Sequence, residues 1–142
     1  MQTKLPPPSE GMEQATLMNW AAMKEWKWPE LRLLFHVPNE GKRSKSTGGR
    51  MVKEGLKKGV PDIMLPVARG DYHGLFIEMK RQKGSRVSDD QKKWMAELVG
   101  QGYATAICYG WEAASECLVS YLSGEIEAHT EWRNANESSC RM

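Results

Sequence analysis

The chain has 142 residues and a formal net charge of +2, and 40% of its residues are hydrophobic. These values are ordinary for one globular domain and exclude a wholly disordered chain. No apolar stretch approaches the roughly 20 residues that span a bilayer, and the N-terminal segment lacks the apolar core of a signal peptide. We therefore expect a cytoplasmic protein without membrane contact.

The first predicted element is a helix over residues 10–26. Ser9 follows a proline run and is a residue type that caps helix N-termini. Helical spacing places Glu10 in one stripe with Leu17, so we expect this carboxylate to point inward. Two alternatives stay open, because Glu13 competes for the inward position and Glu10 can simply be a favourable anion in the first turn.

A strand and a basic loop follow this helix. Apolar residues 30–37 predict a strand, residues 39–50 a polar loop, and residues 49–59 a short helix. Between residues 42 and 58 only Glu54 opposes a run of cations, which are Lys42, Arg43, Lys45, Arg50, Lys53, Lys57 and Lys58. Such a run is either a solvated surface or an arm that follows a phosphate backbone.

Two further strands are predicted to form a hairpin. Residues 59–67 contain a short apolar strand, and a glycine-containing turn leads to a second strand over residues 75–80. Side chains alternate along a strand, so Glu78 and Lys80 share one face of the second strand. We expect Asp62, at the entrance of the first strand, to lie near Glu78 at one end of the hairpin.

The rest of the chain predicts a helix, a strand and a second helix. Ser88 and Gln91 match a capping box at the start of the first helix. Residues 103–110 predict a buried strand and residues 111–124 an amphipathic helix, whereas residues 125–142 are expected to be a polar tail. This order of elements predicts an α/β fold with a central mixed β-sheet flanked by helices.

Three acids and one lysine converge if this topology is right. Asp62, Glu78 and Glu10 would repel one another unless a hard divalent cation joins them, which predicts a site for Mg²⁺ or Mn²⁺. Such a site can activate a water for attack on a phosphate, while Lys80 orients the water or stabilises developing negative charge. The alternatives are an ordinary salt bridge between Glu78 and Lys80 and ordinary turn chemistry at Asp62.

The motifs "EGMEQ", "GVPDI", "IEMK" and "SDDQ" occur in this order along the chain. In this combination the chain resembles the VRR-NUC family of the PD-(D/E)XK nuclease superfamily. That family pairs a G-V-P-D turn with an I-E-x-K strand and a basic helix start of the form S-x-x-Q. The resemblance covers roughly residues 9–123. It implies a nuclease domain over residues 9–124, between an N-terminal extension of residues 1–8 and the tail of residues 125–142.

The resemblance implies a restriction-endonuclease-like core that hydrolyses DNA phosphodiester bonds with a divalent metal. It assigns Asp62 and Glu78 as metal ligands, Lys80 as the catalytic lysine and Glu10 as an additional acid at the metal site. Gln91 matches a glutamine near the site, although it can equally be only the capping-box partner. Small stand-alone members, typically from phages or bacteria, resemble symmetric dimers that act on branched DNA such as four-way junctions. We therefore expect a homodimer in the cytosol of a bacterium or a phage-infected host.

The partner expected from this resemblance is DNA, branched or duplex. The expected phosphate contacts are Lys42, Arg43, Lys45, Arg50, Lys83 and Arg86. Two other functions stay open, a noncatalytic nucleic-acid-binding module and a restriction-type endonuclease on linear duplex. No nucleotide cofactor is expected, because Arg43 stands where a phosphate-binding loop needs Ser or Thr.

Overall fold

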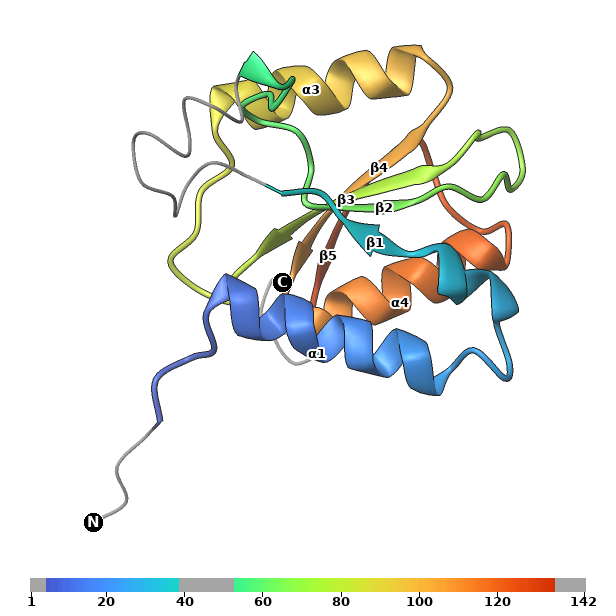
Figure 1. Ribbon diagram of the computed structural model, residues 1–142, viewed down its shortest axis with the longest axis horizontal. Coiled ribbons are helices and arrows are strands. Elements are labelled where there is room, and N and C mark those ends of the chain that lie inside the picture. The colour runs from blue at the N-terminus through green and yellow to red at the C-terminus, as the bar shows by residue number, and fades with distance from the viewer. Residues whose placement is uncertain (1–4, 39–52, 135–142) are drawn as a thin grey trace, which may run out of the picture.

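The computed structural model describes residues 5–38 and 53–134, which form an α/β fold (Figure 1). The strands are β1 (Phe35–His36), β2 (Ile63–Leu65), β3 (Leu75–Lys80), β4 (Ala104–Tyr109) and β5 (His129–Arg133). They form one sheet in the order β1-β2-β3-β4-β5. Pairing is antiparallel from β1 to β2 and from β2 to β3, and parallel from β3 to β4 and from β4 to β5. The predicted fold class is confirmed: the sheet is mixed and the architecture is that of a restriction-endonuclease-like core.

Helices cover both faces of this sheet. They are α1 (Glu10–Met23), the 3-10 helix η1 (Pro29–Leu33), α3 (Asp89–Gly100) and α4 (Trp111–Leu122). Figure 1 shows α1 and α4 together on one face and α3 on the other. The main core lies on the α1 and α4 side and includes Leu17 and Ile77, whereas Met95 of α3 packs with Ile107 and Tyr109 in a smaller cluster. Side chains of β3 that point toward α3 therefore enter a more polar and less filled layer.

Several predicted elements are confirmed with their local causes. The hairpin of β2 and β3 pairs Ile63 with Ile77. The capping box is complete, because the Ser88 hydroxyl accepts from the Gln91 N–H and the Gln91 side chain accepts from the Ser88 N–H. Helix α1 is capped by Ser9 as expected, but it ends at Met23 rather than near residue 26.

Two predictions about strands are wrong. Only Phe35–His36 forms a strand within residues 30–37, because Pro29 at the first position starts the 3-10 helix instead. The segment 125–142 was expected to be a polar tail, yet His129–Arg133 forms β5 at the edge of the sheet. Its polar residues gave no strand alternation, so only the pairing with β4 identifies it.

Parts of the sequence prediction fall outside the described residues. The basic loop of residues 39–50 lies there entirely, and the helix expected over residues 49–59 is described only from residue 53. Among the residues that the structure does describe, no helix is both long enough and apolar enough to cross a membrane.

Candidate active site

The Asp62 side chain lies at the end of the hairpin where β3 finishes. The antiparallel register pairs Ile63 with Ile77, so Asp62 lies opposite Glu78. The Oδ2 atom of Asp62 accepts a hydrogen bond of 2.9 Å from the backbone N–H of Met79. This bond fixes the carboxylate beside Glu78, and the predicted proximity of these two acids is confirmed.

The turn that delivers Asp62 is held against the start of α3. Gly59 has a φ of +93°, a conformation that favours glycine, and a Cβ at this position would lie 2.8 Å from the backbone carbonyl carbon of Asp90. Pro61 is fully buried two residues later. Glycine and proline therefore set the path of the G-V-P-D turn and with it the position of Asp62.

Glu78 is buried, with only 2% of its surface exposed. Its Oε2 atom accepts a hydrogen bond of 3.0 Å from Nε2 of Gln91 and lies 3.7 Å from the Nζ atom of Lys80. Its Oε1 atom is also buried and accepts no hydrogen bond within the described residues. Buried polar oxygens rarely lack a partner, so this atom is an acceptor that suits a cation or a hydrogen-bond donor from outside the described residues.

The pKa of Glu78 is raised to about 9, from an ordinary value of 4.5, chiefly because the carboxyl is buried. The negative charge of Asp62 and a hydrogen bond to its carboxyl also contribute to this rise, and Glu10 adds a smaller effect in the same direction. Lys80 opposes these effects by favouring the carboxylate. Without a cation in the site, Glu78 therefore carries its proton at neutral pH.

Lys80 shares one face of β3 with Glu78, as the alternation of the strand predicts. Its side chain is largely buried and the residue is 7% exposed. An amine in this position is held beside the two acids by the strand itself and by the 3.7 Å contact with Glu78. The structure thus brings Asp62, Glu78, Lys80 and Gln91 together in one place.

The orientation predicted for Glu10 is wrong. Glu10 is exposed, and the acid that continues the buried stripe of Leu17 and Ala21 is Glu13. Glu10 still lies close enough to raise the pKa of Glu78. The phase of the stripe was ambiguous in the sequence because Leu17 is compatible with an acid either four or seven residues earlier.

Glu13 has a structural role that the sequence did not reveal. Its Oε2 atom accepts from Nε2 of Gln82 at 3.0 Å, and its Oε1 atom accepts from the backbone N–H of Trp111 at 3.2 Å. Gly110, the N-cap residue of α4, has no side chain to offer. Glu13 therefore supplies the missing cap from α1.

The donor set fits a hard divalent cation held by few protein ligands. Among the described residues, no three His, Cys, Asp or Glu side chains are grouped as a metal site. The pair Asp62 and Glu78 remains, with a buried Oε1 atom that has no donor. Carboxylate oxygens suit Mg²⁺ and Mn²⁺, and Mg²⁺ commonly keeps waters when only one or two carboxylates bind it.

Two of the predicted DNA contacts lie beside these residues. Lys83 and Arg86 are exposed in the connection between β3 and α3, directly after Lys80. The other predicted contacts, Lys42, Arg43, Lys45 and Arg50, lie outside the described residues. These two cations therefore come from one short connection that follows β3.

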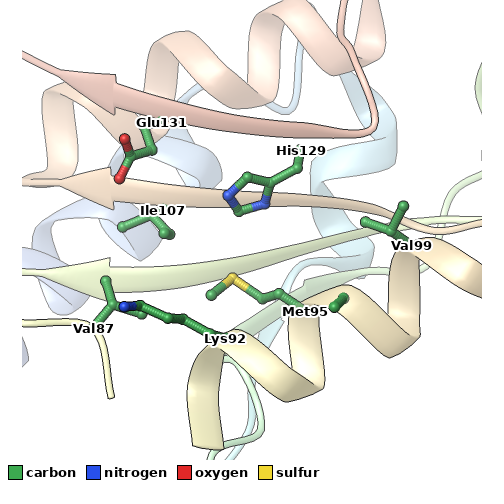
Figure 2. Close-up of a pocket in the computed structure, with 8 residues that line it drawn as sticks. Val87, Lys92, Met95, Val99, Ile107, His129 and Glu131 are labelled. Atoms are coloured by element: carbon green, nitrogen blue, oxygen red, sulfur yellow. The ribbon is translucent and has the colours of Figure 1, made fainter. Parts of the chain in front are cut away.

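An apolar groove of about 580 Å³ adjoins the site between α3 and β5 (Figure 2). It is lined by Val87, Lys92, Met95, Ala96, Val99, Ile107, His129 and Glu131. Ile107 is the β4 partner of Glu78, so the groove begins one strand away from the acids. Figure 2 shows the Lys92 amine and the Glu131 carboxylate toward the carboxyl ends of the strands.

Comparison with known proteins bears directly on these residues. A solved structure described as a VRR_NUC domain protein is similar to this chain with a TM-score of 0.72 and 26% sequence identity, over 89% of this chain and 95% of that chain. No curated protein matches the sequence significantly. The family model of the VRR-NUC domain matches residues 9–112, a span that contains Asp62, Glu78, Lys80 and Gln91. This match indicates a nuclease, and the chain belongs to the VRR-NUC domain family.

Proposed function

We propose that this protein is a divalent-metal-dependent DNA endonuclease of the PD-(D/E)XK superfamily, of the small type found in phages and bacteria. The observation that carries the proposal is the meeting of Asp62, Glu78 and Lys80 at one end of the hairpin, with a buried Glu78 Oε1 atom that accepts no hydrogen bond within the described residues. Two carboxylates and a lysine in this arrangement suit the hydrolysis of a phosphodiester bond.

Asp62 and Glu78 would hold the cation, Mg²⁺ or Mn²⁺, with Glu10 as a further acid at the exposed rim. A bound divalent cation supplies charge neutralisation at the phosphate and lowers the pKa of a water. Glu78 gives up its proton when the site is filled, because a nearby positive charge favours the carboxylate. Gln91 then keeps the Oε2 atom oriented, and the Met79 N–H keeps Asp62 in place.

The Lys80 amine contacts the phosphate of the substrate and is more than the partner of Glu78 in a structural salt bridge. The amine lies on the same face as Glu78 and close to it, so it stands beside any phosphate that the acids help to bind. A fixed positive charge there stabilises the additional negative charge of the transition state. The same amine can donate a hydrogen bond that orients an attacking water.

Branched DNA, such as a four-way junction, is the proposed substrate, and a homodimer is the proposed assembly. Lys83 and Arg86 next to the site supply contacts to phosphates, which fix the position of DNA without reading its sequence. Two sites related by a two-fold axis would make paired cuts in a symmetric junction. This combination favours selection by the shape of the DNA.

Cleavage of end-labelled DNA tests the proposal. Four-way junction, flap, single-stranded and linear duplex substrates are incubated with Mg²⁺, Mn²⁺ or a chelator. The protein is compared with Glu78→Gln, Lys80→Ala and the control Lys27→Ala, which removes an exposed lysine beyond the far end of α1. We expect symmetric cuts in the junction with either metal, none with chelator, and loss of cleavage in the first two variants alone.

Other outcomes would identify the alternatives. Sequence-specific cuts in linear duplex would indicate a restriction-type enzyme. Binding that survives the chelator and Lys80→Ala, with no cleavage at any metal concentration, would indicate a noncatalytic nucleic-acid-binding module. The mass of the protein in solution tests the homodimer separately.

A further inference from the structure

Three parallel strands end side by side next to the candidate site. In their register Lys80 of β3 pairs with Tyr109 of β4, and Tyr109 pairs with Arg133 of β5. Paired residues of neighbouring strands point to the same face of a sheet. Tyr109 packs with Met95 of α3, so this row faces the same side as Glu78. Lys80 and Arg133 are thus the two outer members of one row at the carboxyl ends of the strands.

The Arg133 side chain is stacked on the Tyr109 ring. The guanidinium carbon lies 3.7 Å from the ring centroid, which is a close cation–π contact. Tyr109 is itself 8% exposed and packs with Ile107, so the surface beneath the guanidinium is well fixed. An arginine held in this way loses little side-chain freedom when it binds a ligand.

The hydrogen-bonding capacity of Arg133 is not used within the described residues. Its Nε atom is buried without a hydrogen-bond partner, and its guanidinium forms no ion pair among the described carboxylates. Glu131 is the acid on the same strand and the same face, but it lies exposed along the groove and is not paired with Arg133. A charged and stacked guanidinium that has no ion pair in the described part of the chain suits an anion with several oxygens.

The spacing of the strands that carry the two cations suits two phosphates of one nucleic-acid strand. Neighbouring strands of a sheet are about 4.8 Å apart, so β3 and β5 are separated by about 10 Å. In a duplex each strand carries a phosphate every ~3.4 Å along the axis, so a phosphate within a few nucleotides of the cleaved bond would reach Arg133. A third cation is near, because the Lys92 amine lies in the groove toward the carboxyl ends of the strands (Figure 2).

We propose that Arg133, held on the ring of Tyr109, binds a second phosphate of the nucleic-acid substrate, beside the phosphate that is cleaved at Lys80. The proposal rests on the nuclease function proposed above. It extends that function, because it places the backbone of the bound nucleic acid across the sheet, from Lys80 on β3 to Arg133 on β5. Arg133 is a binding residue in this scheme and does not take part in the chemistry.

Salt-dependent binding provides the test. The affinity for labelled four-way junction and linear duplex is measured with Ca²⁺, a substitute cation chosen to allow binding without cleavage, at several salt concentrations. We expect Arg133→Gln to weaken binding about tenfold and to lower the salt slope by about 0.9, the value for one lost phosphate contact in duplex DNA. The variant Arg133→Lys should keep the salt slope, and Tyr109→Phe, which keeps the ring, should bind like the unchanged protein.

The control is Arg32→Gln, which removes the same charge from the 3-10 helix η1. Folding of each variant is followed by thermal unfolding, and if Arg133→Gln unfolds, Arg133→Met takes its place, because it also removes the charge and keeps a long side chain on the Tyr109 ring. If Arg133→Gln and Arg32→Gln have the same affinity and salt slope while the unchanged protein binds and cleaves DNA, the second phosphate site is overturned and the nuclease function stands. If the unchanged protein neither binds nor cleaves any DNA, the proposed function is overturned and the phosphate site with it.

Discussion

The side chain of Gln91 bonds to Ser88 and to Glu78 at the same time. Its Oε1 atom accepts from the Ser88 N–H at 2.9 Å, and its Nε2 atom donates to Oε2 of Glu78 at 3.0 Å. The sequence left open whether Gln91 caps a helix or serves the site, and one amide does both. The start of α3 is thereby tied to the strand that carries the candidate metal ligand.

Gln91→Glu separates these two roles. A glutamate keeps the capping box, because its oxygen can still accept from Ser88, but it replaces the amide donor to Glu78 with a carboxylate, whose negative charge is added to that of Asp62 in a buried place. We expect the metal-free variant to unfold at a lower denaturant concentration than the unchanged protein at pH 7.5, and we expect Mg²⁺ to restore most of the difference. Denaturant unfolding with and without Mg²⁺ measures this.

Gln91→Ala is the companion variant, because it removes the side-chain half of the capping box and the donor to Glu78 together, while Ser88 remains the N-cap. It should lose about 1 kcal/mol of stability through the lost bond to the Ser88 N–H, and Mg²⁺ should not restore that part. Equal recovery of both variants by Mg²⁺ would contradict the dual role of Gln91.

Lys80→Met should remove cleavage and leave binding in place. Methionine keeps the length of the buried side chain and removes its charge, so we expect kcat on junction DNA to fall by about 10²- to 10³-fold. The affinity for DNA should change by less than about tenfold, because exposed cations supply most phosphate contacts. Single-turnover cleavage and equilibrium binding are measured in parallel with Lys27→Met as the control. A proportionate loss of both quantities would show that Lys80 is mainly a binding residue.

Glu78 makes the metal-free protein less stable as the pH rises. Its pKa is about 9 in the folded protein and about 4.5 in the unfolded chain. Below about pH 4.5 both states carry the proton, and between 4.5 and 9 only the folded state does. Stability therefore falls with rising pH across this window and levels off above it. Urea unfolding in a chelator at pH 6, 7.5 and 9 should show this fall.

Glu78→Gln provides the comparison for that pH series. Glutamine has no proton to lose, so the variant lacks this fall in stability. The free energy of unfolding of the variant minus that of the unchanged protein should therefore become more positive from pH 6 to pH 9. Parallel pH profiles would contradict the raised pKa of Glu78.

Glu10 and Glu13 should respond differently to substitution. Glu13→Ala leaves the Trp111 N–H and the Gln82 amide without an acceptor, so we expect a loss of about 1–3 kcal/mol in stability. Glu10→Gln alters an exposed side chain, so its effect on stability should be small, but it removes a negative charge near Glu78. Unfolding curves and titration with Mn²⁺ measure the two effects. Unchanged Mn²⁺ affinity in Glu10→Gln would remove Glu10 from the metal site.

The parts of the site that the sequence predicted are those set by local geometry. Alternation along a single strand places Glu78 and Lys80 on one face, and the hairpin brings Asp62 opposite Glu78. The capping box at Ser88 is equally local. Each of these features depends on residues that are close in the sequence, so local sequence patterns predict them.

The parts that were missed depend on contacts between distant elements. Glu13 caps α4 from α1, across almost the whole chain, and no local pattern indicates such a bond. The strand β5 is recognised only by its pairing with β4, and the row that contains Arg133 exists only once that pairing is known. The strand predicted over residues 30–37 was wrong for a different reason. Pro29 begins a 3-10 helix there, although the residues that follow it are mostly apolar.

Gly59→Ala should displace Asp62 without touching it. The φ of +93° disfavours any side chain, and the added Cβ would meet the backbone of Asp90 at 2.8 Å, which only a shift of the turn or of α3 can relieve. We expect a loss of more than about 1 kcal/mol in stability and a lower kcat for DNA cleavage. Gly55→Ala is the matched control, because Gly55 has a φ of +110° and a Cβ added there would have no atom of the described residues within 4 Å. Equal kcat values for the two variants, measured under conditions where both are folded, would show that the contact with α3 does not position the acid.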